Sequence, residues 1–369
     1  MHATDRATGN EREMDLGLTQ DQAMLADSVG RFLAAEVGAA ELRKMIERPD
    51  MPAKIWRGLS GLGVHGLMIP EEHGGAGMGL ADLIVVAEKC GAAALPVPFL
   101  SHACAALAVR ELADPGLCDT LLPALASGDR LATVGFAESG ARAAAWVERA
   151  DAADVVVILC GNDGLYVLNR AEGALNVTPE GGADLTRPCF SVALDKARIR
   201  PLAPAAGARL RAAWAIMLAA DAWGIGQRFL TNTRDYAVTR QTFGRKIGEY
   251  QSIKHPLADM AVSHGFAQLL LRRAAQAWDA GEAASAELAC LAKAHITHEV
   301  VGMARQCVEM MGAFGFTWEG GDHIWLKRAM FDCLNAGTPP ALRREIAAAR
   351  GGDNAVQDRT LTRVWRRKL

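Results

Sequence analysis

The sequence lacks the features that mark several large classes of protein. Its formal net charge is only −2 over 369 residues, so nothing favours a nucleic-acid partner. No apolar run is long enough to cross a membrane, and the polar start MHATDRATGNERE has no apolar segment of the kind a signal peptide needs. We therefore expect a cytoplasmic globular protein that binds neither nucleic acid nor membrane.

Metal-binding and simple hydrolase motifs are missing as well. The eight cysteines include no CxxC pair and no disulfide-like spacing, which argues against a zinc site and against a secreted scaffold. His295 and His298 lie three residues apart on a predicted helix, but no third ligand is near them in the sequence, so we predict no metal site. No GxSxG or Walker A motif is present, which weighs against a hydrolase.

What is present is a change of hydrophobic pattern along the chain. A helical pattern opens at a predicted capping box formed by Thr19 and Gln22. The short β-branched or alternating runs LATVGFAE, DVVVILC, GLYVLN and CFSVAL then predict strands. Helical periodicity returns in long segments, which predict a bundle; these are 209–239, 256–280, 284–312 and 340–350.

This order of patterns predicts an α+β protein with three domains and two flanking segments. The predicted parts are a flexible N-terminal extension (1–17), an N-terminal helical domain (18–125), a middle β domain (126–205), a C-terminal helical bundle (206–350) and a basic tail (351–369).

RQTFGRKIGEYQSIKHPLADM, residues 240–260, is the most distinctive stretch of the sequence. It predicts a helix end, a glycine-containing turn with basic residues and a new helix near Pro256. Arg240, Lys246 and the free amides of the turn are suited to hold a phosphate. An ordinary turn between helices, with solvated surface charges, is the alternative interpretation.

EMMGAFGFTWEGGDHIWLKRAM, residues 309–330, is equally ambiguous. Gly312 and Gly315 allow a close approach of the backbone at a helix end, which serves either a cofactor or tight packing. Glu319, Asp322 and His323 are expected in the loop that follows, exposed to solvent.

Together these motifs resemble the acyl-CoA dehydrogenase family, flavoenzymes that desaturate acyl-CoA thioesters. RQTFGRKIGEYQSIKHPLADM is similar to the family signature, and IPEEHGGAGM resembles its PEEYGG-type turn. DLTRPCFSVAL resembles a strand of the middle domain, and EMMGAFGF stands where the family has a QxxGGxG-type segment. The resemblance covers about residues 18–350. It implies an N-terminal helical domain, a small middle β-barrel domain and a C-terminal four-helix bundle.

The resemblance also implies FAD bound at a dimer interface. One subunit holds most of the isoalloxazine and the substrate, while its neighbour contacts the ADP half. Carried over to this sequence, the neighbour's contacts are Arg240, Thr242, Phe243, Gln251, Glu309, Gly312 and Ala313. Glu309 stands for the expected glutamine and Ala313 for the second glycine. The implied partners are an acyl-CoA substrate, an electron-transfer acceptor and a homologous or identical subunit, in a dimer or tetramer.

The implied reaction needs a carboxylate that removes the substrate's α-proton, and the family places it at one of three positions. Ala336, in Asn335–Thr338, occupies the first position and Trp214 the second, and neither accepts a proton. The third belongs to an A-E-x-x-G motif of subfamilies resembling steroid-degrading dehydrogenases. Asp221 stands there, one methylene short, and its apolar helical neighbours are expected to raise its pKa.

The middle domain departs from the family as well. FAESGARAAAWVERADAADVVV lacks the proline and the Ser/Asp end of the TEPxAGSD-type segment that contacts flavin and thioester. We interpret the chain as the non-catalytic subunit of a heteromeric, α2β2-type acyl-CoA dehydrogenase that completes the FAD site of a glutamate-bearing partner. The alternatives are a self-sufficient homo-oligomeric dehydrogenase with Asp221 as base, and a flavin-free binding or assembly module.

Overall fold

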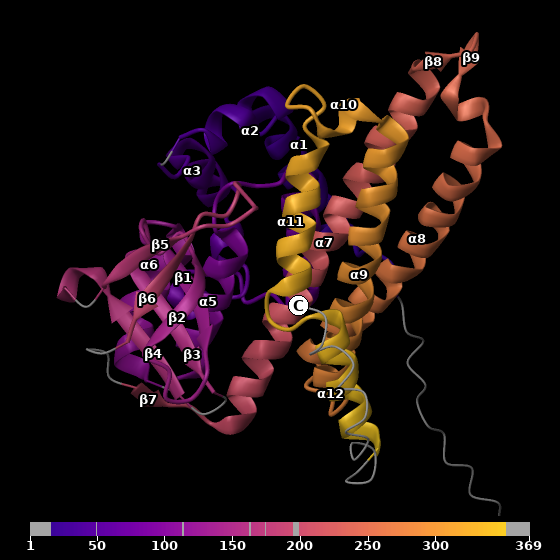
Figure 1. Cartoon of the computed structure of the whole chain (residues 1–369). Coiled ribbons are helices and arrows are strands. Elements are labelled where there is room, and N and C mark those ends of the chain that lie inside the picture. The colour runs from indigo at the N-terminus through magenta and orange to yellow at the C-terminus, as the bar shows by residue number, and fades with distance from the viewer. Residues whose placement is uncertain are drawn as a thin grey trace, which may run out of the picture.

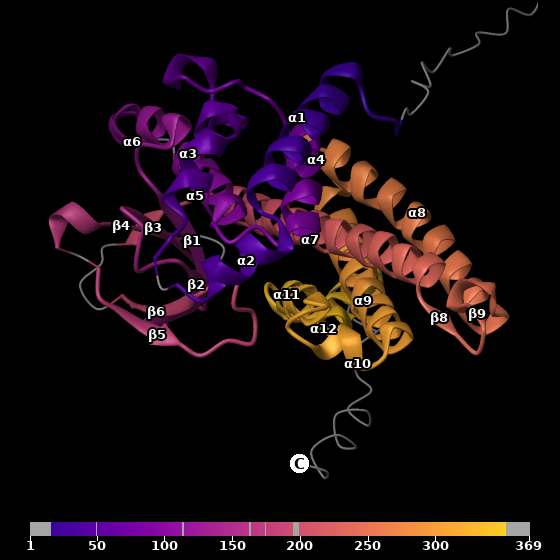
Figure 2. The same ribbon diagram turned by 90° about the horizontal axis from the view of Figure 1, so that it is seen from above.

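The computed structural model describes residues 16–351, apart from 49, 113, 162–163, 174 and 195–198. Residues 1–15 of the predicted extension and 352–369 of the predicted tail therefore lie outside the described residues. The chain runs through helices, then two sheets, then a bundle of long helices (Figures 1 and 2). The predicted α+β fold class is confirmed.

The first layer is helical, and its first helix begins as the sequence predicts. Thr19 Oγ1 accepts a hydrogen bond from the Gln22 amide at 3.2 Å, and Gln22 Oε1 accepts one from the Thr19 amide at 3.1 Å, which confirms the capping box. The helical elements are α1 (Gln20–Glu36), α2 (Ala39–Ile46), α3 (Ala53–Gly61), η1 (Val64–Gly66), η2 (Glu71–His73), α4 (Leu80–Ala93), α5 (Phe99–Glu111) and α6 (Pro115–Ser127).

Two sheets follow, with strand orders β1-β3-β4-β7 and β2-β6-β5. The four predicted strand segments form β1, β3, β4 and β6, and β3 is buried along its whole length. The sequence pattern misses β2, which is rich in alanine, β5, which contains a proline, and β7, which has three residues. The elements are β1 (Ala132–Ala137), β2 (Ala143–Glu148), β3 (Val155–Cys160), β4 (Gly164–Asn169), η3 (Arg170–Glu172), β5 (Val177–Glu180), β6 (Cys189–Ala193) and β7 (Ile199–Pro201).

The third part is a bundle in which α7 packs against α8, α9 and α11, and a short hairpin of β8 and β9 joins α7 to α8 (Figure 1). None of the helices between residues 16 and 351 is both long and apolar enough to cross a membrane. The elements are α7 (Pro204–Thr239), β8 (Gln241–Thr242), β9 (Arg245–Lys246), η4 (Ile247–Glu249), α8 (Gln251–Asp279), α9 (Ser285–Met311), α10 (Ala313–Phe316), α11 (Asp322–Leu334) and α12 (Pro339–Gly351).

The prediction of a solvated loop at Asp322 and His323 is wrong. Both residues open helix α11 and are buried, Asp322 to 3 % exposure. Asn232 Nδ2, on α7, donates a hydrogen bond to the Asp322 carboxylate at 3.1 Å. This polar segment can therefore be buried, because a side chain on another helix provides a hydrogen bond to it.

Helices α4 and α7 cross so closely that each presents a glycine to the other's backbone. A Cβ added at Gly91 of α4 would lie 1.9 Å from the Asp221 carbonyl oxygen, and one added at Gly224 of α7 would lie 1.9 Å from the Glu88 carbonyl oxygen. Real side chains do not approach carbonyl oxygens this closely. The glycine of the A-E-x-x-G-like segment thus has a packing role here, and it fixes the backbone that carries Asp221.

We expect Gly91→Ala to lower the free energy of unfolding by about 3 kcal/mol or more, because α4 and α7 must separate to admit the methyl group. Gly302→Ala, on α9, is the matched control, since nothing lies within 4 Å of its added Cβ. The control is expected to stabilise the protein by about 0.5–1 kcal/mol. Urea unfolding followed by far-UV circular dichroism measures both, and equal effects would contradict the close crossing.

Candidate functional site

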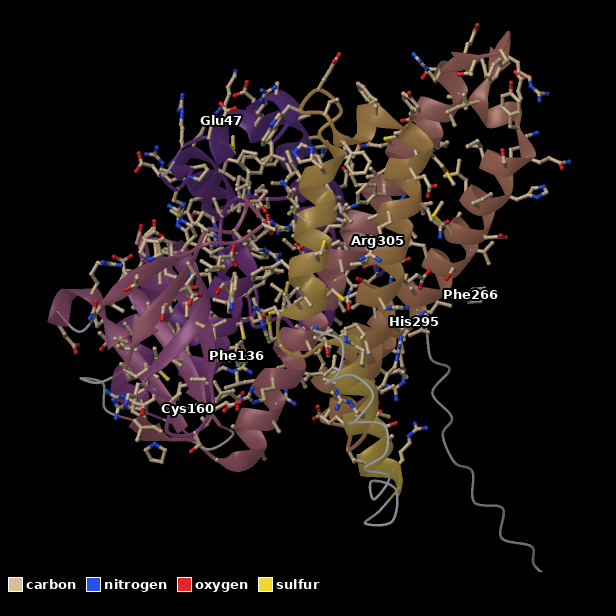
Figure 3. All side chains as sticks on the ribbon, in the orientation of Figure 1. Glu47, Phe136, Cys160, Phe266, His295 and Arg305 are labelled. Atoms are coloured by element: carbon tan, nitrogen blue, oxygen red, sulfur yellow. The ribbon has the colours of Figure 1, made fainter. Side chains whose placement is uncertain are left out.

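A cavity of about 480 Å³ lies between the sheets and the bundle. Its walls are largely apolar. Phe136, on β1, is one of the lining residues (Figure 3). Its ring stacks against the Trp214 ring of α7 with centroids 5.9 Å apart. Trp214 Nε1 donates a hydrogen bond to Asn335 Oδ1 at 2.9 Å. Trp214 and Ala336, two of the three predicted base positions, therefore line one cavity, although neither is a base.

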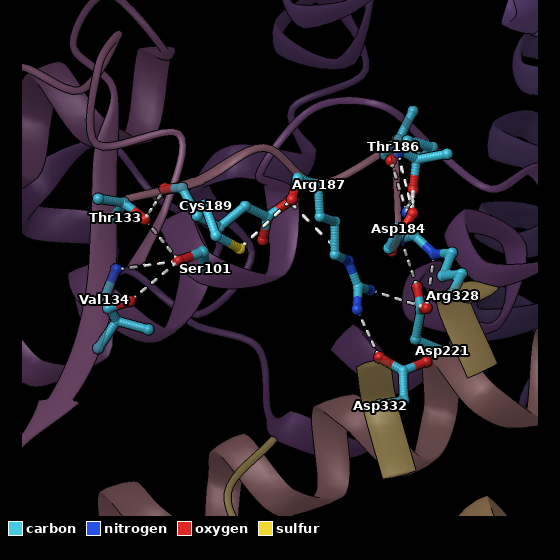
Figure 4. Close-up of polar contacts among 12 residues, drawn as sticks. Ser101, Thr133, Val134, Asp184, Thr186, Arg187, Cys189, Asp221, Arg328 and Asp332 are labelled. Atoms are coloured by element: carbon cyan, nitrogen blue, oxygen red, sulfur yellow. Dashed lines mark hydrogen bonds and ion pairs between the residues drawn. The ribbon is translucent and has the colours of Figure 1, made fainter. Parts of the chain in front are cut away.

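Asp221, the third position, does not line this cavity. Its carboxylate is fully buried and accepts three hydrogen bonds from two arginines (Figure 4). Arg328 Nε and Nη2 donate to Oδ2 and Oδ1, each at 2.8 Å, and Arg187 Nη2 donates to Oδ2 at 2.8 Å. Both oxygens of Asp221 are thus engaged by guanidinium groups.

The expectation that apolar neighbours raise the pKa of Asp221 is wrong. Burial acts to raise it, but the charges of Arg187 and Arg328 outweigh burial and lower the pKa of Asp221 to about 2. A carboxylate with so low a pKa is a weak base, and its lone pairs already accept the arginine hydrogen bonds. The arrangement suits a structural anion and gives no support to proton abstraction by Asp221.

Asp332 completes a buried cluster that joins three parts of the fold. Arg187, in the loop before β6, also donates from Nη1 to Asp332 Oδ1 at 2.5 Å, while Arg328 and Asp332 lie on α11. Burial raises the pKa of Asp332 well above its usual range. The pKa values of the two aspartates are thus shifted in opposite directions, and Asp332 binds a proton more readily than Asp221 does. The sequence pattern misses Arg187, Arg328 and Asp332, because no local periodicity pairs residues so far apart in the chain.

The predicted cofactor-binding residues lie elsewhere, around the hairpin between α7 and α8. Phe243, at the hairpin tip, is 93 % exposed and has a backbone φ of 53°, which is unusual outside glycine. The Tyr250 hydroxyl donates to the Thr242 carbonyl at 3.1 Å, and the Arg245 guanidinium lies 3.8 Å from the Tyr250 ring centroid. These contacts hold the hairpin in shape although its tip is exposed.

An open cavity of about 730 Å³ lies beside the hairpin. Its lining includes five of the seven predicted cofactor-binding residues, namely Arg240, Thr242, Glu309, Gly312 and Ala313. Phe243 and Gln251 do not line it; Gln251 is exposed at the start of α8.

The donors at this second cavity fit a phosphate-bearing group. Arg240 forms no ion pair with any described residue, and guanidinium and hydroxyl donors suit phosphate oxygens. Gly312 has φ 62° and ψ −144°, a conformation open essentially to glycine alone. Glu309 adds a negative charge to the same lining. The set of donors therefore fits the ADP half of FAD, with one acidic departure.

The two cavities share no lining residue. Figure 1 shows β8 and β9 at the end of the bundle that points away from the two sheets. The hairpin of one chain is therefore remote from that chain's own cavity beside Trp214, and none of the predicted cofactor-binding residues lines that cavity.

The N-terminal and C-terminal parts of the chain both match models of one protein family. The family model described as "Acyl-CoA dehydrogenase, N-terminal domain" matches residues 19–129, and "Acyl-CoA dehydrogenase, C-terminal domain" matches residues 212–350. The chain is 31 % identical to acyl-CoA dehydrogenase IpdE2 of Mycobacterium tuberculosis, over 84 % of this chain and 91 % of that protein.

Two solved structures show the same fold. The ChsE4-ChsE5 complex from Mycobacterium tuberculosis superposes with a TM-score of 0.80 at 22 % identity, over 90 % of this chain and 98 % of that one. A glutaryl-CoA dehydrogenase from Mycobacterium smegmatis in complex with FADH2 superposes with a TM-score of 0.79 at 19 % identity, over 91 % and 96 %.

We expect Asp221→Asn and Asp332→Asn to differ sharply in stability although the two aspartates share one cluster. Asp221→Asn removes the ionised partner of two buried arginines and should lower the free energy of unfolding by about 3–5 kcal/mol. Asp332→Asn keeps an acceptor for Arg187 and replaces the acid whose pKa is raised by burial, so a loss of about 1 kcal/mol or less is expected. Urea unfolding at pH 7 measures both.

Asp235→Asn is the control, because the ion pair between Arg234 and Asp235 is exposed on both sides and contributes little. Equal losses at positions 221 and 332 would contradict the opposite pKa shifts of the two aspartates.

Proposed function

The chain belongs to the acyl-CoA dehydrogenase family of FAD-dependent oxidoreductases, and on this premise we propose that it completes the FAD site of a homologous subunit that carries the base. The assembled enzyme desaturates an acyl-CoA thioester between its α and β carbons. When bound, FAD supplies the two-electron acceptor of that reaction. The observation that best supports the proposal is that Asp221, the last candidate base, is held by two arginines outside the cavity.

Among the described residues, no carboxylate lines the cavity beside Trp214 on the bundle side, where the family resemblance places the base. Trp214 and Ala336 line that side and have no basic atom, and Asn335 accepts the Trp214 indole hydrogen. The carboxylates that do line the cavity, Glu148 and Asp184, belong to β2 and to the segment between β5 and β6. They lie on the sheet side, across from the bundle helices.

The hairpin has the properties expected of a group that serves another chain. Phe243 exposes almost its whole side chain, and exposing so large an apolar group is unfavourable unless a partner covers it. Arg240 and Thr242 line the neighbouring open cavity, where a phosphate group can reach them. One solved structure of this fold, the ChsE4-ChsE5 complex, is itself an assembly of two differently named chains. In the proposed assembly, Arg240 binds the pyrophosphate and Phe243 packs against the partner.

A self-sufficient enzyme with Asp221 as base is less well supported. Asp221 would have to give up its hydrogen bonds with Arg187 and Arg328 and enter a cavity that it does not line. The loss of two buried ion pairs would accompany every such movement. A flavin-free binding module makes a different prediction, since Arg240 would then have no effect on flavin content.

The proposal is tested by co-expressing the chain with a homologous subunit that carries a glutamate base, and recording the visible spectrum of the purified complex. Arg240→Ala is expected to lower the flavin bound per complex at least severalfold, because a charge-assisted contact to the pyrophosphate is lost. Arg57→Ala, at an exposed position of α3, is the matched control and should leave the flavin content unchanged. Unchanged flavin in both variants would favour the flavin-free module, and a yellow chain that an acyl-CoA bleaches without any partner would favour the self-sufficient enzyme.

Phe243→Ala tests the interface separately from the phosphate contact. Because Phe243 makes no buried contact within its own chain, the substitution should leave the melting temperature of the isolated chain within about 1 °C. The dissociation constant of the complex should rise by about tenfold or more, as is typical for removal of an aromatic anchor. Sedimentation velocity over a concentration series measures the association. An unchanged dissociation constant would place the interface elsewhere.

A further inference from the structure

Glu148 is a buried acid that the proposed function does not use. It is the last residue of β2 and 6 % exposed, and its side chain lines the cavity beside Trp214. Its nearest cation is Arg187, whose Nε lies 3.9 Å from Glu148 Oε1, too far for a hydrogen bond. Among the described contacts, no hydrogen bond reaches this carboxyl group.

Arg187 donates no hydrogen bond to Glu148, because the two terminal nitrogens of its guanidinium group bind other carboxylates. Nη1 donates to Asp332 at 2.5 Å and Nη2 donates to Asp221 at 2.8 Å (Figure 4), so neither of these two nitrogens is available to Glu148. Lys327 also lines the cavity, but it forms no ion pair with Glu148. A buried carboxyl group without a donor is unfavourable, so this position favours a ligand that brings one.

The rest of the cavity favours a largely apolar ligand. With a volume of about 480 Å³ it has room for a molecule of several fused rings or a branched chain. Its apolar wall is contributed by β1, β2, α7 and α11, through Phe136, Trp146, Trp214, Met330, Phe331 and Leu334.

The isoalloxazine of FAD is a poor match for this acid. The polar edge of the oxidised ring presents mainly acceptors, two carbonyl oxygens and two imine nitrogens, with a single N–H donor. A carboxylate facing that edge repels it, and reduction adds negative charge to the ring. Glu148 therefore disfavours a flavin in this chain's own cavity, whereas the hairpin cavity fits the ADP half of a flavin whose ring lies in the partner.

We propose that the cavity of this chain binds an apolar ligand that donates a hydroxyl hydrogen bond to Glu148, in place of a flavin ring. The inference rests on the proposed function in one respect: the flavin of the complex belongs to the partner's cavity, with the hairpin of this chain completing it. The complex then holds one FAD per pair of chains, and the second cavity is a separate ligand site.

The first experiment measures binding of 2-naphthol and of 2-methoxynaphthalene to the full-length complex by equilibrium dialysis at pH 8. The two probes have similar shape, and only 2-naphthol has a hydroxyl hydrogen. The wild type is expected to prefer 2-naphthol by about tenfold, the effect of a hydrogen bond to a charged acceptor. Glu148→Leu should abolish the preference. Equal binding of the two probes by the wild type would overturn the proposal.

Glu88→Gln is the matched control. Glu88 is also 6 % exposed, and burial raises its pKa to about 7, as it does for Glu148, but Glu88 does not line the cavity. This variant should keep the tenfold preference. If Glu148→Leu does not fold, Glu148→Gln should still lower the preference severalfold, because a neutral acceptor forms a weaker hydrogen bond.

The probe preference should also depend on pH. Because the pKa of Glu148 is raised to about 7, its ionised fraction falls below pH 7, and the preference for 2-naphthol should shrink between pH 8 and pH 5. The charged groups that face Glu148 are Arg187, Arg328, Asp184 and Asp221. A preference of the same size at both pH values would show that Glu148 is not the acceptor.

The flavin content of the same complex separates this inference from the proposed function. One FAD per two chains is expected, and two per pair would overturn the inference while leaving the role of Arg240 intact. Conversely, flavin content that Arg240→Ala does not alter would overturn the proposed function, and the preference for 2-naphthol and its loss in Glu148→Leu would still be measurable.

Discussion

Arg187 and Arg328 carry two positive charges into the interior of the protein, where each costs several kcal/mol unless opposite charges surround it. Asp221 and Asp332 provide that surrounding, and the four residues come from the loop before β6, from α7 and from α11. Arg328 Nη1 also donates to the Leu95 carbonyl at 3.0 Å, so the segment after α4 is tied to the same cluster. Removing either aspartate leaves an arginine without one of its ion-pair partners.

This cluster explains why Asp221 is a weak base. A carboxylate that neutralises two buried guanidinium groups is stabilised in its ionised form, and the same stabilisation lowers its affinity for a proton. The backbone at Asp221 is constrained as well, because its carbonyl packs against Gly91 of α4. The backbone that carries Asp221 therefore cannot shift toward α4 without opening this helix crossing. The ion pairs that stabilise the fold at Asp221 also make this residue a poor proton acceptor.

The cluster also shapes the cavity beside it. Because the Arg187 guanidinium is drawn toward Asp221 and Asp332, Glu148 keeps a cavity-facing carboxyl group without a hydrogen-bond donor. The hairpin cavity, at the far end of the bundle, is lined by Arg240, which forms no ion pair with a residue that the structure describes, and the exposed Phe243 lies at the hairpin tip. One end of the chain thus exposes an aromatic side chain, and the cavity near the sheets holds a buried acid.

Local sequence determined much of this protein. Capping residues, alternation and helical periodicity are properties of neighbouring residues, so the capping box at Thr19, the strands β1, β3, β4 and β6 and the long bundle helices follow from the sequence. Only the tertiary structure determined the pKa of Asp221, since Arg187 is 34 residues away along the sequence and Arg328 is 107 residues away. The tertiary structure also buried Asp322 and placed Glu148 at the wall of the cavity. The physical reason is that pKa and burial depend on charges and solvent brought close in space, which no spacing along the chain records.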